Sequence, residues 1–499
     1  MRGVLSLAVA ALAAVGHASI TCDQVESQTS IEIHERFDVE YTSEQTKYWS
    51  TAAGALKPAC IIMPKTVQEV AAIVNILRNN NETFAIKSGG HNPNNYFSSI
   101  DGGPLISTKN LNQVILDPAT ETARIGPGNR WDRVAEQLDG TGYTVVGGRI
   151  GDVGVGGFML GNGLSFMSTE YGWAVNSVIE FEVVLANATI VYVNENNHPD
   201  LFMALKGGGN NFGIVTSYLV KAYPQGQIWG GNLIFDATPE VTQKILSATY
   251  NFTTKYNDGK AGIIITAERT LATLVDIWVI FLFYNGPTPP PEVFGEFFAV
   301  SNFKLNTCKT RSMSDLVSGN NWANLKGSVY TIATETMPMP DEAHGLEVLN
   351  AFYDHWVTVS NQVKLVPGLV TSMAFQPAPK RLASIARSKG GDMLDLDPTY
   401  DRIVLELDYS YIGNLSSPTV DGVVRETYEG FKTIIEDYQE SGVLPQDAFL
   451  PLFQNDCFYP QDFFGRLRPE KLALAKSVQN AVDPTRFFHT RTGGFKIPQ

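Results

Sequence analysis

Phe84-Ala-Ile-Lys-Ser-Gly-Gly-His-Asn-Pro-Asn94 is the stretch around which the fold of this chain is predicted. Its apolar start predicts a buried strand, and the chain then turns at Ser88-Gly89-Gly90 and presents His91. Two adjacent glycines let backbone N–H groups approach an anion closely, because neither carries a Cβ atom. A histidine at this place could serve as a base, a metal ligand or a point of covalent attachment. A glycine-rich turn with a surface histidine is the alternative, because short glycine motifs also occur by chance.

The residues before this stretch predict a β-α-β unit that leads into the turn. Residues 61–63 form a short apolar run that ends at a proline. Thr66 and Glu69 then have the spacing of a capping box, which marks the start of a helix. Apolar residues follow at helical spacing at Val70, Ile73, Val74 and Leu77.

Two further glycine-rich regions follow at residues 147–163 and 207–213. Valine, isoleucine and phenylalanine are interleaved with these glycines, which disfavours flexible linkers. Three glycine-rich turns at strand edges favour one extended ligand that crosses the domain. Neither the G-x-G-x-x-G spacing of a Rossmann site nor the P-loop pattern is present, which leaves a dinucleotide held in another way.

The second half of the chain has a different pattern. Alternating strands are predicted at residues 232–235, 263–266, 275–283 and 403–411, and helices at 238–256, 345–357 and 420–440. This order predicts an antiparallel sheet with helices on one face. The predicted fold class is therefore α+β with two domains. The predicted segments are a signal peptide at 1–18, a first domain at 19–225, a second at 226–450, and a C-terminal segment at 451–499 that returns to the first domain.

The composition is that of a soluble globular protein: 44% of the 499 residues are hydrophobic and 18% are charged. The net charge of −14 disfavours nucleic acids and anionic membranes as partners, because their phosphates require lysine and arginine. Residues 1–18 have a positive start at Arg2, an apolar core and the small-residue cleavage pattern Gly16-His17-Ala18. These features predict a signal peptide and a secreted protein.

Four cysteines follow, namely Cys22, Cys60, Cys308 and Cys457. None lies in a CxxC or Cys/His cluster, so no metal site is predicted. A secreted protein permits disulfides, and we favour Cys22–Cys60, with the state of the other two cysteines left open. Sequons for N-glycosylation begin at Asn81, Asn187, Asn251 and Asn414.

Several motifs, in this order along the chain, resemble those of the secreted FAD-linked oxidases of the vanillyl-alcohol oxidase superfamily. The similarity is greatest to the berberine-bridge-enzyme-like branch as it occurs in fungi, and it extends over nearly the whole mature chain. The motifs are Ser88-Gly-Gly-His-Asn92, Val153-Gly-Val-Gly-Gly157, Pro199-Asp-Leu-Phe202, Leu205-Lys-Gly-Gly-Gly-Asn-Asn-Phe-Gly-Ile-Val-Thr216, and Asp483-Pro484 with Gly493-Gly-Phe-Lys496.

This resemblance implies a bipartite FAD-binding domain and a substrate domain made of an antiparallel sheet covered by helices. It implies that His91 is bonded to the 8α-methyl carbon of the flavin. Many relatives carry a second, cysteinyl link at the position of Ile150, so attachment through His91 alone is expected. Val153 matches a position at which valine accompanies reactivity with dioxygen. The implied cofactor-binding residues are His91, Ile86, Ser88, Gly89, Gly90, Asn92, Ile150, Val153, Gly154, Gly157, Gly163, Ile214 and Asn455.

The chemistry also requires a base that removes an O–H or N–H proton while hydride leaves the substrate carbon. Sugar-oxidising relatives use the last residue of a Tyr-x-Asn-Tyr motif, and here the stretch ends in Asp456. Asp456 is therefore a catalytic candidate, with a structural hydrogen-bonding role as the alternative. Along residues 402–412, Glu406, Asp408 and Ser410 alternate with the tyrosines. Tyr409 and Tyr411 are the further catalytic candidates, and the alternative is that they pack against helices.

The sequence thus predicts a monomeric FAD oxidase that acts on a small molecule, with dioxygen as acceptor and hydrogen peroxide as product. Its substrate would be an intermediate of secondary metabolism or a carbohydrate-type alcohol. A non-redox isomerase or cyclase that uses Asp456 as an acid is one alternative. A binding protein on an inactive fold is another.

Overall fold

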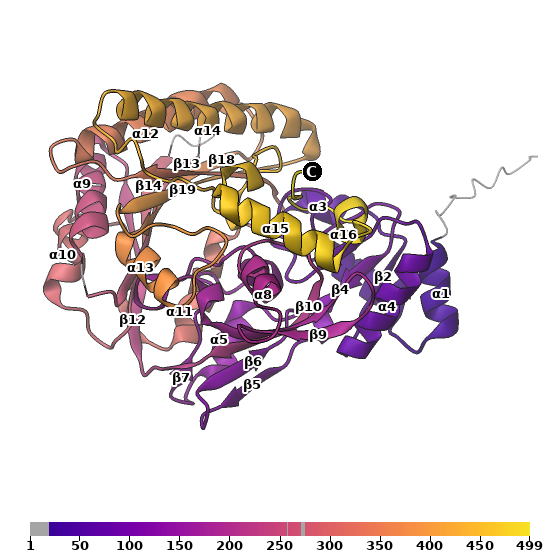
Figure 1. Cartoon of the computed structure of the whole chain (residues 1–499). Helices are drawn as coiled ribbons and strands as arrows, with labels where there is room; N and C mark the ends of the chain where they lie inside the picture. Colours follow the sequence, from indigo (N-terminus) through magenta and orange to yellow (C-terminus); the bar gives the residue numbers. More distant parts are fainter. Residues whose placement is uncertain (1–18, 257, 271–274) are drawn as a thin grey trace, which may run out of the picture.

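The computed structural model of the chain describes residues 19–256, 258–270 and 275–499. The predicted signal peptide lies outside the described residues. The chain has the predicted α+β class, with an N-terminal half and a second half side by side (Figure 1). The boundaries proposed for the domains remain predictions.

The first sheet contains the predicted β-α-β unit. Its order is β1-β2-β4-β3, and β4 is parallel to both β2 and β3. Helix α4 connects β2 to β3, and the Thr66 side chain accepts a hydrogen bond from the Glu69 backbone N–H at its start. The apolar stripe of this helix is buried. The bounds are Ile33–Glu35 (β1), Cys60–Ile62 (β2), Ala85–Lys87 (β3), Leu105–Ser107 (β4) and Val67–Asn79 (α4).

A disulfide joins Cys22 to Cys60, as predicted. It connects helix α1 (Ile20–Gln28) to strand β2 and closes a loop with a sequence separation of 38 residues. The bond therefore ties the first described helix to the sheet that ends at the glycine turn. Cys308 and Cys457 are free.

A second sheet completes the N-terminal half, with the order β5-β6-β10-β8-β9 and antiparallel pairing throughout. Helices α5, α6 and α8 accompany it. The bounds are Val114–Asp117 (β5), Thr122–Ile125 (β6), Val178–Val184 (β8), Ile190–Val193 (β9), Ile214–Lys221 (β10), Trp131–Leu138 (α5), Val155–Leu160 (α6) and Pro199–Leu205 (α8).

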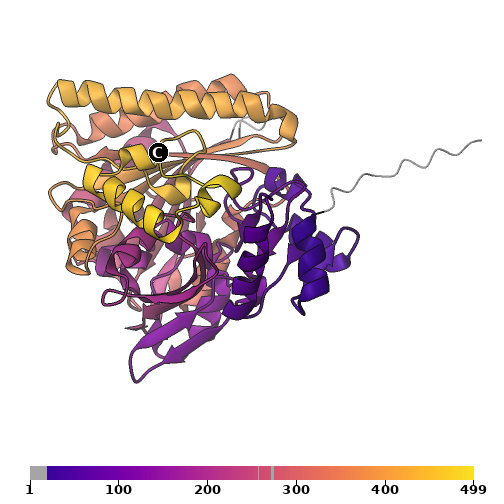
Figure 2. The same ribbon diagram turned by 45° about the vertical axis from the view of Figure 1, so that its right-hand side comes forward.

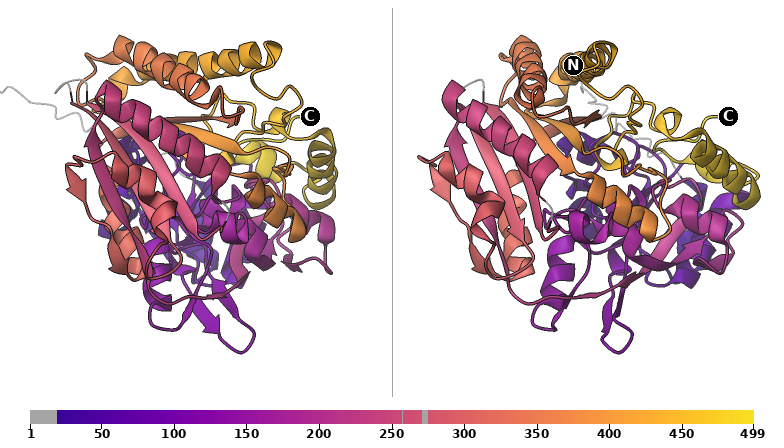
Figure 3. Two further views of the ribbon diagram at one scale, coloured as in Figure 1. Left: turned by 90° about the vertical axis from the view of Figure 1, so that its left-hand side faces the viewer. Right: turned by 60° about the vertical axis from the view of Figure 1, so that its left-hand side comes forward.

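The second half is built on one large antiparallel sheet. Its order is β15-β12-β14-β13-β18-β19-β17, and β16 also pairs with β12. Figures 2 and 3 show helices covering one face of this sheet while the N-terminal half lies against the other. The strand bounds are Ile228–Asp236 (β12), Ala261–Thr270 (β13), Val275–Tyr284 (β14), Leu305–Asn306 (β15), Lys309–Arg311 (β16), Val329–Pro338 (β17), Val370–Ala378 (β18) and Arg402–Tyr411 (β19). The helix bounds are Pro239–Lys255 (α9), Pro291–Ala299 (α10), Met313–Gly319 (α11), Gly345–Ser360 (α12), Lys380–Ser388 (α13) and Ser417–Glu440 (α14).

The two faces of this sheet bury different side chains, because neighbours along a strand point to opposite sides. The helix-covered face forms an apolar core with α9, α12 and α14, to which β19 contributes Leu407, Tyr409 and Tyr411. The other face carries Glu406 and Asp408 of β19 into a cavity between the two halves. Strands β17 and β18 were not predicted from the sequence, because neither has a regular alternation of apolar and polar residues.

The C-terminal segment contacts the N-terminal half. Helix α15 (Pro469–Val482) packs against α8. Helix α16 (Phe487–Arg491) contacts strand β3 at its start: the Phe84 backbone N–H donates a hydrogen bond to the Arg491 carbonyl oxygen at 2.9 Å, and the ring centroids of Phe84 and Phe487 lie 5.2 Å apart. Among the described residues, no helix is long and apolar enough to cross a membrane.

The remaining elements are short. They are Val39–Thr46 (α2), Thr51–Ala55 (α3), Ser168–Tyr171 (α7), Tyr143–Thr144 (β7) and Tyr223–Pro224 (β11).

Candidate functional site

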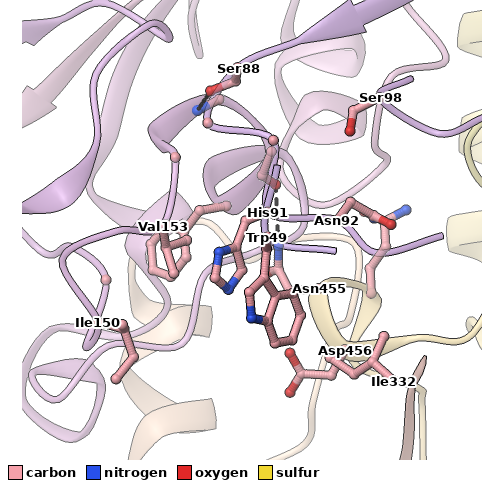
Figure 4. A pocket seen from close by; sticks show the side chains of 18 of the residues that line it. Trp49, Ser88, His91, Asn92, Ser98, Ile150, Val153, Ile332, Asn455 and Asp456 are labelled. Carbon is pink, nitrogen blue, oxygen red and sulfur yellow. Dashed lines mark hydrogen bonds between the residues drawn. The ribbon is translucent and has the colours of Figure 1, made fainter. Parts of the chain in front are cut away.

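A cavity of about 380 Å³ lies between the glycine-rich loops of the N-terminal half and the inner face of the large sheet (Figure 4). The loops before and after His91 form one wall. Strands β13, β14, β17, β18 and β19 form the other, and the segment 453–456 lies between them. One elongated space therefore reaches both halves of the molecule.

The wall on the N-terminal side depends on two loops whose backbones touch. A Cβ atom added at Gly154 would lie 2.4 Å from the Gly89 backbone nitrogen, and one added at Gly89 would lie 2.5 Å from the Gly154 Cα atom. Ser88 Oγ accepts a hydrogen bond from the Gly156 N–H at 3.0 Å and donates to the Pro127 carbonyl oxygen at 2.5 Å. The glycines are thus required for loop contact, and the serine holds the contact together.

The lining fits an extended dinucleotide such as FAD. Other glycines leave the cavity wall open: a Cβ atom at Gly157 would meet nothing within 4 Å. Ser98 lines the same space, and its buried hydroxyl has no hydrogen-bond partner among the described residues. Apolar side chains from β3 and β10, Ile86 and Ile214, offer surfaces for flat rings. An elongated ligand with ring systems and phosphates matches this combination.

We predict that Gly154→Ala destabilises the protein, whereas Gly226→Ala does not. The new methyl group at residue 154 would force the two loops apart, at a cost of about 1–3 kcal/mol. Gly226 is exposed and a Cβ atom there meets nothing within 4 Å, so it is the matched control. Denaturant unfolding of both variants measures the difference, and equal midpoints would show that the loops tolerate separation.

His91 lies at the junction of the two walls. Its ring stacks on Trp49, with centroids 4.3 Å apart and an interplanar angle of 1°. Among the described residues its ring nitrogens have no hydrogen-bond partner. Enclosure of the ring lowers the pKa of His91 to about 3, and the nearby charge of Asp152 opposes this shift only in part. The imidazole is therefore neutral at physiological pH, with a free lone pair.

An ionic network supports the loop that carries His91. Arg130 donates to the Gly89 carbonyl oxygen at 2.7 Å and pairs with Asp152, and Asp152 also pairs with Lys326. The Asp152 backbone N–H donates to Asn321 Oδ1 at 2.7 Å. The network connects the loop before Val153 to the second half of the molecule and so fixes the relative position of the two walls.

The inner face of the sheet places carboxyl groups in a row. Glu268 on β13 and Asp408 on β19 both pair with Ser372 of the strand between them. Glu406 lies two residues before Asp408 and hence on the same face. Asp408 Oδ1 is buried without a hydrogen-bond partner among the described residues. Burial raises the pKa of Glu268 and of Glu406, and it raises the pKa of Asp408 to about 8.

Asp456 differs from these three carboxyl groups because a series of side-chain hydrogen bonds holds it in place. Gln376 donates to Asp456 Oδ2 at 2.8 Å, and Arg149 donates to the carbonyl oxygen of the Gln376 side chain. Burial raises the pKa of Asp456 to about 6, and the Gln376 hydrogen bond and the Arg149 charge limit the rise. At neutral pH Asp456 is therefore mostly ionised. Burial and the neighbouring charges of Asp456 and Asp408 raise the pKa of Glu406 well above its ordinary value. Two neighbouring carboxyl groups in different surroundings are suited to different roles.

Most of the predicted site residues line this one cavity. These are Ile86, Ser88, Gly89, Gly90, His91, Asn92, Ile150, Val153, Gly154, Gly157, Ile214, Asn455 and Asp456. Gly163 lies behind the wall, where its N–H donates to Asn455 Oδ1 at 3.2 Å, while Asn455 Nδ2 donates to the Gly157 carbonyl oxygen.

Tyr409 and Tyr411 do not reach the cavity, which corrects the prediction of a catalytic role. Both side chains are fully buried in the core under α12 and α14. The Tyr411 hydroxyl donates to Ser417 Oγ at 2.9 Å, at the start of α14. The alternation along β19 identified which residues share a face, but the helices decide which face points away from the site.

Several lining residues were not predicted. Trp49, Arg149 and Glu268 are the clearest cases, together with the aromatic wall of Phe281 and Trp322. Arg149 could have been noticed as a charged residue within a glycine-rich loop. Trp49 gave no signal, because it precedes the first predicted strand and reaches His91 only through the fold.

Comparison with known proteins gives a consistent result. Residues 58–194 match the FAD binding domain family. The chain is 42% identical over 461 residues to an FAD-linked oxidoreductase of Arthroderma benhamiae, covering 92% of this chain and 91% of that protein. It is 32% identical to an FAD-dependent monooxygenase of Aspergillus calidoustus, covering 92% and 86%. Its fold matches glucooligosaccharide oxidase from Acremonium strictum at a TM-score of 0.74 and 18% identity, covering 96% of this chain and 99% of that one.

Proposed function

This chain belongs to the FAD-linked oxidoreductases and shares its fold with berberine bridge enzyme, and from that premise we propose that it is an oxidase of an apolar small molecule with dioxygen as the acceptor. The observation that carries the proposal is the pair Asp456 and Glu406, which line one cavity with His91, and of which Asp456 is held by a hydrogen bond from Gln376.

When bound, FAD accepts hydride from the substrate carbon and passes two electrons to dioxygen, which leaves as hydrogen peroxide. The protein supplies the proton transfer. Ionised Asp456 takes the proton from the substrate O–H or N–H group, so that an alcohol becomes a carbonyl group and an amine becomes an imine. Glu406, whose pKa burial raises, would in its protonated form donate a hydrogen bond that orients the substrate. Arg149 and Gln376 keep Asp456 charged by stabilising its carboxylate.

We propose covalent attachment of the flavin at His91. The neutral imidazole can form a bond to the 8α-methyl carbon. One C–H hydrogen and the imidazole N–H proton leave, and dioxygen takes up both hydrogens with two electrons as hydrogen peroxide. The solved glucooligosaccharide oxidase is described as carrying a 6-S-cysteinyl, 8α-N1-histidyl FAD. Ile150 lines the cavity here and has no sulfur, which supports a single link.

The lining favours a substrate with an apolar body over a carbohydrate. Ile264, Val279 and Phe281 form a continuous apolar surface on the inner face of the sheet, beside Ile332 and Ala374. A sugar presents hydroxyl groups on most of its edges, and these groups would lose hydrogen bonds to water against such a wall. A compact ring compound with one reacting alcohol or amine fits the apolar wall on one side and the acids on the other.

A monooxygenase is the second candidate, because the Aspergillus calidoustus relative is named as one. Both functions consume dioxygen, and they differ in where its oxygen atoms go. An oxidase releases both atoms as peroxide, whereas a monooxygenase places one in the product. The non-redox isomerase or cyclase would consume none.

A panel of phenolic, terpenoid and alkaloid alcohols, together with oligosaccharides, tests the proposal under ¹⁸O₂. We expect flavin bleaching by an apolar compound, one hydrogen peroxide per dioxygen consumed, and no label in the product. Label in the product would replace the oxidase by the monooxygenase. Turnover without dioxygen would establish the non-redox alternative, and turnover of oligosaccharides alone would refute the apolar substrate class.

We also propose that the protein is secreted and acts as a monomer. The predicted leader, the Cys22–Cys60 disulfide and the exposed sequon residues Asn81, Asn187 and Asn414 support secretion. Mass spectrometry of protein recovered from culture medium tests it: an N-terminus at residue 19 and glycan at these sites are expected.

A further inference from the structure

Trp49 lies between the loop that carries His91 and the large sheet, and it contacts both. Its indole stacks on His91 with parallel planes and also stacks on Tyr330 of β17, at a centroid distance of 4.1 Å and an interplanar angle of 30°. Trp49 is 5% exposed and lines the cavity with His91 (Figure 4). The three rings form one stack that crosses from the N-terminal half to the large sheet.

The backbone around Trp49 is fixed from both ends. The Trp49 N–H donates to the Gly90 carbonyl oxygen at 2.9 Å, in the loop directly before His91. On the other side, the Thr51 N–H donates to the Ser328 carbonyl oxygen at 2.9 Å, and Ser50 Oγ accepts a hydrogen bond from the Tyr330 N–H at 3.1 Å. The indole therefore has a defined position relative to both walls.

His91 has no comparable support of its own. Its ring nitrogens make no hydrogen bond to the described residues, so packing alone sets the plane of the ring. Rotation about its side-chain bonds would otherwise swing both nitrogens through a wide arc. A reaction at one ring nitrogen requires that nitrogen to lie within about 3–3.5 Å of the reacting carbon, and a displacement of about 1 Å can reduce the rate about a hundredfold.

We propose that Trp49 is the positioning residue for flavin attachment: by stacking on His91, with Tyr330 behind it, the indole fixes the plane of the imidazole so that a ring nitrogen meets the 8α carbon. This inference rests on the proposed covalent link at His91. It also connects that link to the substrate site, because Tyr330 lies on the strand that carries Ile332 into the cavity.

The indole also covers one face of the His91 ring. Removing it would expose the imidazole to more water and let its pKa rise toward its ordinary value of 6.5. The charged groups that face His91 are Asp152, which favours the protonated ring, and Arg130 and Lys326, which oppose it. Attachment by the neutral ring would then decline as the pH falls toward 6, whereas in the parent protein the ring stays neutral. A role in folding alone predicts no such pH dependence.

Trp49→Leu tests the inference, with Trp49→Phe as the conservative variant and Trp229→Leu as the matched control. Trp229 is a half-buried tryptophan that stacks on Phe294, and it is not among the residues that line the cavity. Each purified holoprotein is acid-precipitated, and the flavin in the pellet is divided by the total flavin. The rate at which bound flavin becomes covalent is then followed from pH 5 to pH 8.

We expect Trp49→Leu to bind FAD but to attach it about tenfold to a hundredfold more slowly, with a further decline at acidic pH. Trp49→Phe should recover most of the rate, and Trp229→Leu should match the parent. Normal attachment in Trp49→Leu would overturn the inference and leave the covalent link intact. A parent protein that releases all its flavin in acid would overturn the link and the inference together.

If Trp49→Leu is not secreted, Tyr330→Leu is tested in its place. This variant removes the ring that supports the indole from behind, so it should also slow flavin attachment.

Discussion

His91→Ala is expected to abolish covalent flavin while leaving FAD-binding loops intact. Acid precipitation should move all flavin from the pellet to the supernatant, because no other described side chain at the cavity offers a neutral nitrogen or sulfur nucleophile at this place. The loop itself should persist, since Arg130 and Trp49 hold it through the backbone carbonyls of Gly89 and Gly90. The variant should therefore bind FAD reversibly and lose colour on dialysis.

His344→Ala is the control for this prediction. His344 precedes α12, far from the glycine loops, and its ring pairs with Asp341. It should keep the covalent flavin of the parent. Flavin that stays in the denatured His91→Ala pellet would contradict the assignment and identify another attachment site. Loss of all flavin together with loss of cooperative unfolding would show instead that His91 is needed for the fold.

Much of the fold could be predicted because its helices carry a one-sided apolar pattern. Helix α9 differs from the predicted range 238–256 by one residue at each end, and the predicted apolar positions of α4 are buried. Strand β17 could not be found in this way. All its residues are buried, and it includes Thr334 and Glu335. Their polar groups are satisfied only in the folded chain: Thr334 Oγ1 donates to the Leu405 carbonyl oxygen, and Glu335 pairs with Arg466.

The candidate site likewise has a part that could be predicted from the sequence and a part that could not. The cofactor side was predictable because its residues form contiguous motifs, and the contact of Gly89 with Gly154 explains why glycine is needed at both positions. The substrate side is assembled from single residues on separate strands. Glu268 and Asp408 become neighbours of Ser372 only through strand pairing, and Trp49 meets His91 only through tertiary packing. Local sequence carries no record of such contacts.

Asp456→Asn is expected to reduce kcat by about 10²–10⁴, the usual contribution of a general base. Asparagine keeps the shape of the side chain and can still accept the hydrogen bond from Gln376, so substrate and FAD binding should persist. It cannot accept the substrate proton. The loss should therefore appear in kcat, with little change in bound flavin or in the unfolding midpoint.

The role of Asp456 as a base also predicts the direction in which kcat/KM changes with pH. A base acts only when deprotonated, and burial raises the pKa of Asp456 to about 6. In the parent, kcat/KM should rise with pH through about 6 and then level off, and Asp456→Asn should lose this rise. Because Glu406 and Asp408 interact with Asp456, the observed midpoint belongs to the coupled group. Glu406→Gln should keep the rise, because Asp456 is still present, and should change KM little, since the glutamine amide can still donate a hydrogen bond to the substrate.

Asp447→Asn is the control, because Asp447 is exposed and accepts a hydrogen bond from the Tyr400 hydroxyl outside the cavity. It should have the kcat and pH profile of the parent. If Asp456→Asn kept the rise in kcat/KM while Glu406→Gln lost it, the roles would be exchanged. The hydrogen-bonded chain from Arg149 through Gln376 argues against that exchange, since it stabilises negative charge on Asp456 and so keeps this carboxylate able to accept a proton.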